Sequence, residues 1–97
     1  MPKGYIIARV RIDDLEQYKK YMAVSPDAIG AYGGKFLVRG GDYETVEGDP
    51  ESRRLVVVEF PTYEDALECY NSEVYQEAKK LRVHAGDAQF VVVRGAD

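Results

Sequence analysis

The fold of this chain is set by the segment YIIARVRI at residues 5–12, in which two kinds of side chain alternate. One side of the extended segment is wholly apolar and consists of Ile6, Ala8, Val10 and Ile12. The other side mixes apolar and charged groups and consists of Tyr5, Ile7, Arg9 and Arg11. Alternation with a period of two predicts a β-strand that buries its apolar side.

The segment after this strand has the pattern of an amphipathic helix, with apolar residues at Leu15, Tyr18, Met22 and Ile29. Asp13 or Asp14 can cap the start of this helix, and Gly33-Gly34 ends it. Pro26 has no amide hydrogen and crowds the preceding turn. We therefore expect the helix to kink or restart there, with Ser25 capping the restart.

Further strands are expected at residues 35–39, 54–60 and 89–94. Gly40-Gly41 permits a bulge, after which residues 43–47 continue the second strand. A second helix opens at Thr62 with Asp65 and is interrupted at Asn71-Ser72. The expected buried stripe of this helix is Ala66, Leu67, Tyr70, Val74, Ala78 and Leu81.

The order of these elements is βαββαβ, and it accounts for residues 1–97 as a single domain. Two right-handed crossovers place the first and third strands in the middle of a four-stranded antiparallel sheet. The same crossovers lay both helices on one face of the sheet. The residues expected on that face are Ile6, Ala8, Val10, Ile12, Phe36, Val38, Val56, Val58 and Phe60.

The opposite face of the sheet is left without cover and has a mixed character. Its expected residues are Tyr5, Ile7, Leu37, Leu55 and Val57, with Arg9, Arg11, Arg39 and Glu59 among them. This face is too apolar for open water and too charged for a core. A second copy of the same sheet would cover it with one self-complementary patch. We therefore predict a homodimer through the open sheet face.

Composition excludes several classes of protein. The chain has 97 residues with a formal charge of −4, and its basic residues are dispersed, which argues against nucleic-acid binding. The longest aliphatic run, at 55–58, is far shorter than a membrane span, and no signal peptide is recognisable, so a cytoplasmic location is expected. One cysteine and one histidine offer neither a disulfide nor a metal site, and we expect no cofactor.

The block YGGKFLVRGG at residues 32–41 is followed by Glu47-Gly48, by VEFP at 58–61, and by YNS at 70–72 with Tyr75. These motifs resemble the family known as domain of unknown function 1330 (DUF1330), over nearly the whole chain. One departure is Glu73, where relatives often carry proline. The resemblance implies a ferredoxin-like fold that pairs as a dimeric α+β barrel, and it implies no established activity.

The wider dimeric α+β barrel superfamily includes cofactor-free monooxygenases, haem-degrading enzymes, lactone isomerases and ligand-sensing modules. Many of these proteins keep their ligand in a cleft between the helices and the sheet. The fold alone does not choose among these activities. The resemblance therefore supplies a location for a candidate site and no chemistry.

Glu59 and Arg39 are the charged candidates for that cleft. A carboxylate within an apolar strand would be desolvated, and its raised pKa would suit acid–base chemistry. The alternative is an ion pair of Glu59 with Arg39 or Arg9, because buried charges usually persist only when paired. Arg39 has a further alternative, which is to hold a carboxylate ligand through its planar guanidinium.

Tyr18, Tyr70 and Tyr75 are the aromatic candidates, since they fall on or near the helix faces that border the cleft. An aromatic ring with a polar tip suits a ligand pocket, and it suits equally the edge of an ordinary core. His84 and Arg82 lie near a helix end, where a cation interacts favourably with the helix dipole.

Three remaining features have structural explanations. Cys69 has no cationic neighbour in sequence that would lower the pKa of its thiol, so we expect an unreactive side chain within a helix. The pairs Asp13-Asp14 and Glu64-Asp65 stand at helix starts, where carboxylates cap the backbone and complement the dipole.

Two functions remain open from the sequence. The first is a homodimer with a small-molecule cleft lined by Tyr18, Arg39, Glu59, Tyr70 and Tyr75. The alternative form of this hypothesis is a cofactor-independent enzyme that resembles a monooxygenase or an isomerase. The second is a dimeric module without catalysis, whose interior charges set the register of two sheets. No catalytic residue is identified under either hypothesis.

Overall fold

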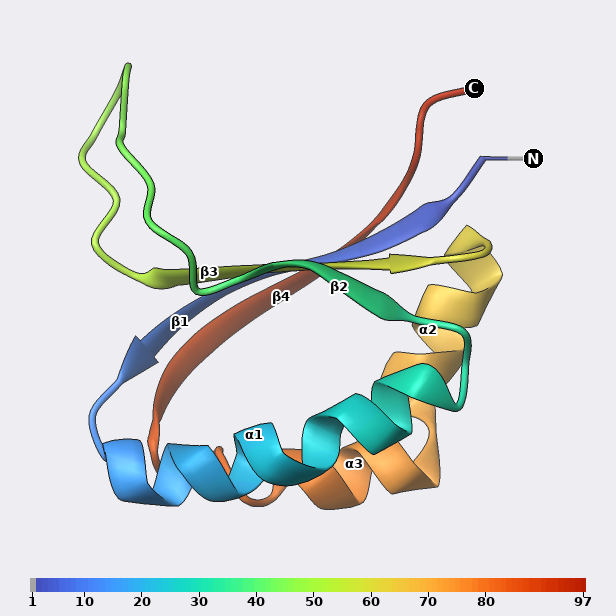
Figure 1. Ribbon diagram of the computed structural model, residues 1–97, viewed down its shortest axis with the longest axis horizontal. Coiled ribbons are helices and arrows are strands. Elements are labelled where there is room, and N and C mark those ends of the chain that lie inside the picture. The colour runs from blue at the N-terminus through green and yellow to red at the C-terminus, as the bar shows by residue number, and fades with distance from the viewer. Residues whose placement is uncertain (1) are drawn as a thin grey trace.

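Four antiparallel strands and three helices form two layers in the computed structural model, which describes residues 2–97 (Figure 1). The strands are β1 (Gly4–Ile12), β2 (Lys35–Arg39), β3 (Arg54–Phe60) and β4 (Gly86–Arg94). The helices are α1 (Leu15–Gly30), α2 (Tyr63–Asn71) and α3 (Glu73–Lys79). The strand order β2-β3-β1-β4 places β1 and β3 in the centre, as predicted. All three helices cover the same face, which confirms the expected ferredoxin-like α+β fold.

Each helix starts at a side chain that accepts a hydrogen bond from the backbone amide three residues later. The pairs are Asp14 with Gln17 at 3.1 Å, Thr62 with Asp65 at 3.0 Å and Ser72 with Tyr75 at 3.2 Å. These caps satisfy amides that have no partner inside the helix. The predicted helix starts, including the fresh start at Ser72, are confirmed.

α1 runs from Leu15 to Gly30 as one helix, so the predicted restart at Pro26 is wrong, and Ser25 is buried. Because proline has no N–H, the carbonyl of Met22, four residues earlier, lacks its helical donor. Arg39 of β2 supplies one, since its Nη2 donates to the Met22 oxygen at 2.9 Å. A side chain from the neighbouring layer thus replaces the missing backbone hydrogen bond.

β2 contains an extra residue at Leu37 that the sequence pattern does not reveal. The two residues flanking it pair with adjacent positions of β3, Val58 and Val57, so the strand bulges. Every side chain after the bulge changes face. Val38 therefore lies on the open face and Arg39 turns toward the helices, which is the reverse of the prediction for both residues.

The segment between β2 and β3 is an irregular arm at residues 40–53. It rises from the sheet on the side away from the helices (Figure 1). The predicted continuation of the second strand through residues 43–47, beyond a bulge at Gly40-Gly41, is therefore wrong. Within the arm, the Tyr43 hydroxyl donates to the Arg53 carbonyl at 2.6 Å. Contacts inside the arm thus take the place of a strand ladder.

The helix-facing layer holds the buried core. Its largest fully buried side chains include Tyr75, Phe60 and Val58, as well as the thiol of Cys69. The predicted stripe on the second helical segment is wrong at Val74, which is 49% exposed, whereas Ala78 is buried as predicted. The fresh start at Ser72 places Tyr75 in the core instead, at 2% exposure.

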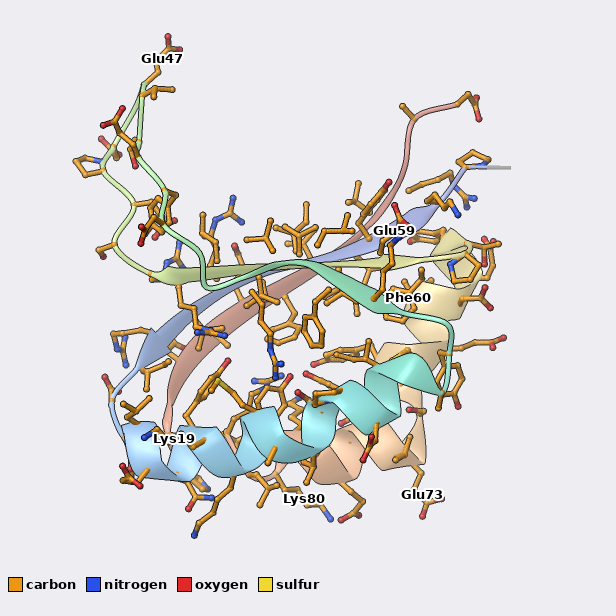
Figure 2. The ribbon with its side chains drawn as sticks, viewed as in Figure 1. Lys19, Glu47, Glu59, Phe60, Glu73 and Lys80 are labelled. Atoms are coloured by element: carbon orange, nitrogen blue, oxygen red, sulfur yellow. The ribbon has the colours of Figure 1, made fainter. Side chains whose placement is uncertain are left out.

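The open face of the sheet carries an apolar row across all four strands. The row consists of Val38, Val57, Ile7 and Val91, which are successive cross-strand partners. Figure 2 shows Glu59 on this side of the sheet and the next residue, Phe60, on the side of the helices. Among residues 2–97, no helix is long and apolar enough to cross a membrane.

Candidate functional site

A cavity of about 30 Å³ lies between α1 and the sheet, and apolar side chains of all four strands form its walls. The polar residues that line it are Tyr18, Tyr21, Ser25, Arg39, Arg54 and Tyr75. Since roughly 10–15 Å³ is enough for one water, the cavity has room for two or three water-sized groups. Arg39 is exposed to solvent, so the cavity meets water on the side of β2.

Buried tyrosines form the floor of the cavity. The hydroxyl oxygens of Tyr21 and Tyr75 are 2.7 Å apart and share a hydrogen bond, and the rings of Tyr18 and Tyr21 have centroids 5.4 Å apart. Burial raises the pKa of Tyr18 and, more strongly, that of Tyr75, because the phenolate would be desolvated. The hydroxyls of Tyr18 and Tyr75 are therefore neutral hydrogen-bonding groups at physiological pH.

Two arginines stand at the edge of the cavity and a third stands behind its floor. Arg39 lies 4.4 Å from the centroid of the Phe36 ring, and Arg54 has a buried Nε with no hydrogen-bond partner. Arg82 is only 8% exposed and lies against the Phe90 ring at 4.2 Å, with its Nη2 donating to the Tyr75 hydroxyl at 3.2 Å.

These cations have no counter-charge close by. The residues that line the cavity include no aspartate or glutamate, and no ion pair within residues 2–97 involves Arg39, Arg54 or Arg82. Uncompensated guanidinium groups beside an apolar cavity attract anions. The site is thus a place where a negatively charged group would be stabilised.

The structure brings together three of the five residues that the sequence singled out. Tyr18, Arg39 and Tyr75 all line the cavity. Tyr70 lies one layer further out, with its ring centroid 5.3 Å from that of Tyr75. Glu59 is separated from all of them, because it lies on the open face of the sheet.

The predicted ion pair of Glu59 with Arg39 or Arg9 is wrong. Glu59 instead accepts a hydrogen bond from the Tyr5 hydroxyl at 3.2 Å, and its other oxygen lies 3.9 Å from the Lys35 ammonium. Arg9 pairs with Glu51 of the arm at 3.4 Å. The strand register is the reason, since Glu59 lies opposite Tyr5 and Lys35 while Arg9 and Arg39 lie opposite Leu55 and Val56, and the bulge in β2 also turns Arg39 to the other face of the sheet.

Tyr21, Arg54 and Arg82 were not identified from the sequence. Arg54 was open to recognition, because it is in phase with Val56 and Val58 on the helix-facing side of β3. Tyr21 follows Tyr18 by three residues and so shares its helix face. Arg82 was assigned to the helix dipole, and only the fold brings its side chain under Tyr75.

Two other titratable groups lie away from the cavity. Cys69 is fully buried, with its Sγ 3.7 Å from the Ala28 carbonyl oxygen, and desolvation raises the pKa of its thiol to about 11. His84 is exposed in the turns that follow α3. Within residues 2–97, no three histidine, cysteine, aspartate or glutamate side chains gather as metal ligands.

The architecture defines an α+β domain of the ferredoxin-like class, with a candidate site between its two layers. Within that class, the chain belongs to the family described as domain of unknown function (DUF1330), whose model matches residues 3–96. No curated protein matches the chain.

Solved structures with the same fold include proteins of unknown function. The chain is similar to the protein RPA0582 from Rhodopseudomonas palustris, with a TM-score of 0.77, 22% identity, and coverage of 99% of this chain and 84% of that one. It is also similar to a dimeric ferredoxin-like protein from Thermobifida fusca, with a TM-score of 0.63, 15% identity, and coverage of 96% and 91%.

A third similar structure is a protein from Caulobacter crescentus that is provisionally named an antibiotic biosynthesis monooxygenase. Its TM-score is 0.61 at 11% identity, with coverage of 99% of this chain and 92% of that one. Similarity at these levels of identity establishes the fold and leaves the chemistry open.

Proposed function

We propose that this protein is a homodimer that binds a small molecule in the cavity between α1 and the sheet. The observation that carries the proposal is the unpartnered Nε of Arg54 at the edge of an apolar cavity. A buried donor without an acceptor costs about 1–3 kcal/mol, so native proteins rarely retain one without a reason. A ligand that accepts this hydrogen bond provides one.

Binding is better supported than catalysis by the groups that line the cavity. A cofactor-independent enzyme needs a group that takes a proton from its substrate or gives one to it near neutral pH. Burial raises the pKa values of Tyr18 and Tyr75, and arginine stays protonated. These groups hold and orient a ligand without exchanging a proton with it.

A thermal-shift screen of a chemically mixed fragment set tests the binding proposal. Val56→Phe fills the cavity from β3, while Val83→Phe places the same group at a position 42% exposed to solvent. We expect fragments that stabilise the wild type and the Val83 variant to lose their effect on the Val56 variant. Fragments that stabilise all three proteins equally would place binding elsewhere.

The homodimer proposal rests on the open face. Its apolar row ends at Val91, which is 40% exposed on the single chain, and the Val93 side chain beside it is equally exposed. The similar structure from Thermobifida fusca is described as dimeric. Pairing two copies through this face would remove the row from water.

Light scattering coupled to size-exclusion chromatography tests the dimer. Val91→Glu would bury a carboxylate in the interface of both copies, which costs several kcal/mol, so we expect a monomer. Val83→Glu introduces the same charge away from this face and should leave the dimer intact. A wild type that elutes as a monomer at micromolar concentration contradicts the proposal.

A further inference from the structure

The cations around the cavity indicate the chemical class of its ligand, and this inference rests on the proposed function. We propose that the ligand is a small organic monocarboxylate, whose carboxylate is bound between Arg39 and Arg54 while its short apolar chain lies against the sheet. The charge balance is the first argument. Two guanidinium groups line the cavity, and no carboxylate of residues 2–97 lines it with them.

Arg54 lies in a position suited to this task. Its guanidinium lies so close to Gly40 that a Cβ at that position would collide with Nη1, and Gly40 has a φ of +73° that favours glycine. The same side chain lies 6.0 Å from the centroid of the Tyr18 ring. Its Nε has no acceptor. A carboxylate matches the fork formed by Nε and an Nη group, and it can accept from both at once.

Arg39 supplies the second cation on the solvent side. Its Nη2 is bound to the Met22 carbonyl, which is available only because Pro26 has no N–H. One hydrogen bond uses one of the five donors of a guanidinium, so others remain for a ligand. The Phe36 ring supports the guanidinium at 4.4 Å. Arg39 therefore remains in place whether or not a ligand is bound.

The size and the walls of the cavity exclude a large or highly charged ligand. A volume of about 30 Å³ admits only a small ligand, such as a carboxylate with a short apolar chain. The walls beyond the arginines are apolar side chains and neutral tyrosines. A second charge on the ligand would be desolvated there without a partner.

Titration followed by NMR spectra of the arginine side-chain Nε–H groups tests the proposal. The probes are acetate, propionate and butyrate as sodium salts, with propionamide as the neutral analogue and inorganic phosphate as the competing anion. We expect the carboxylates to shift the Arg54 Nε–H signal and saturate, while propionamide and phosphate bind at least tenfold more weakly.

The matched variants are Arg54→Gln at the start of β3 and Arg53→Gln at the end of the arm. We expect at least a tenfold loss of carboxylate affinity for Arg54→Gln and less than a twofold change for Arg53→Gln, since Arg53 pairs with Glu51 of the arm. Should Arg54→Gln fail to fold, Arg54→Lys keeps the charge without the fork and should lose at least fivefold.

The outcomes separate this inference from the proposed function. Equal binding of propionamide and propionate, tighter binding of phosphate, or unchanged affinity in Arg54→Gln would each overturn the carboxylate assignment while leaving a ligand cavity in place. If neither these probes nor any fragment binds in a manner sensitive to Val56→Phe, both proposals fail.

Discussion

The contact between Arg39 and Pro26 predicts an energetic coupling between two residues that are far apart in sequence. Arg39 donates to the Met22 carbonyl at 2.9 Å because Pro26 cannot. Changing Pro26 to alanine restores an N–H that bonds this carbonyl within the helix. Arg39 then loses its structural task, so Arg39→Met should cost less stability in the alanine background than in the wild type.

The size of the coupling follows from the geometry. A hydrogen bond from a charged donor contributes about 1.5–3 kcal/mol when well shielded, and Arg39 is exposed, so we expect a cost of about 1 kcal/mol for Arg39→Met. Methionine still contacts the Phe36 ring, which limits the change to the hydrogen bond. In the alanine background the cost should fall to about 0.3 kcal/mol, a coupling of about 0.7 kcal/mol.

Pro26→Ala alone should raise the free energy of unfolding by about 1 kcal/mol. Proline in a helix interior is about 3 kcal/mol less favourable than alanine, but Arg39 already offsets part of this, and the more flexible unfolded chain offsets about 0.4–1 kcal/mol more. In a domain of this size, 1 kcal/mol corresponds to a Tm change of roughly 4–8 °C.

Urea denaturation of the four proteins at one fixed concentration measures this cycle. A fixed concentration is needed because dissociation of a dimer would contribute to the apparent stability. If the two single changes add to within about 0.3 kcal/mol in the double variant, Arg39 does not substitute for the missing amide. The explanation for the uninterrupted helix would then be wrong.

Three further predictions concern other parts of the chain. Arg53 lowers the pKa of Glu51 from 4.5 to about 2, chiefly through a side-chain hydrogen bond. This carboxylate therefore stabilises the fold above pH 4.5, and the effect fades as the pH falls toward 2. In urea denaturation between pH 2 and 6, the free energy of unfolding should fall less steeply with acid for Glu51→Gln than for the wild type, and identical slopes would contradict the assignment. Cys69, with a thiol pKa of about 11, should react with iodoacetamide at pH 8 only after denaturation, and rapid labelling of the native protein would refute its burial. Ser72→Ala removes the cap of α3 and should lower the free energy of unfolding by about 1 kcal/mol. The control Ser52→Ala, in the exposed arm, should change it by less than about 0.5 kcal/mol. Equal effects of the two variants on the denaturation midpoint would count against the cap.

Local patterns were sufficient for most of the elements. Alternation in residues 5–12 predicted β1 because one strand face must be buried wherever it pairs. Asp14, Thr62 and Ser72 predicted the helix starts because each side chain bonds an amide only three residues away. These interactions lie within single elements, so their signals survive in the sequence.

The candidate site was predicted only in part, because it depends on the register between elements. Tyr18 and Tyr75 were singled out because they fall on or near the helix faces that border the cleft. Glu59 was assigned to the same cleft although its phase in the strand placed it on the open face, and the face of Arg39 was predicted on the assumption that β2 alternates without interruption, which the bulge at Leu37 invalidates. Arg54 was overlooked although its phase with Val56 and Val58 placed it on the helix-facing side, because an arginine there does not by itself indicate a cavity.

The sequence by itself determined the order of the strands and helices, and that one sheet face would be covered by helices while the other remained partly apolar. Only the tertiary structure decided which cations face the cavity. A single extra residue in β2 reverses the direction of every later side chain, and the pairing with β3 that accommodates it is absent from the local pattern. The same reversal brings Arg39 to the Met22 carbonyl, which Pro26 leaves without a donor within α1.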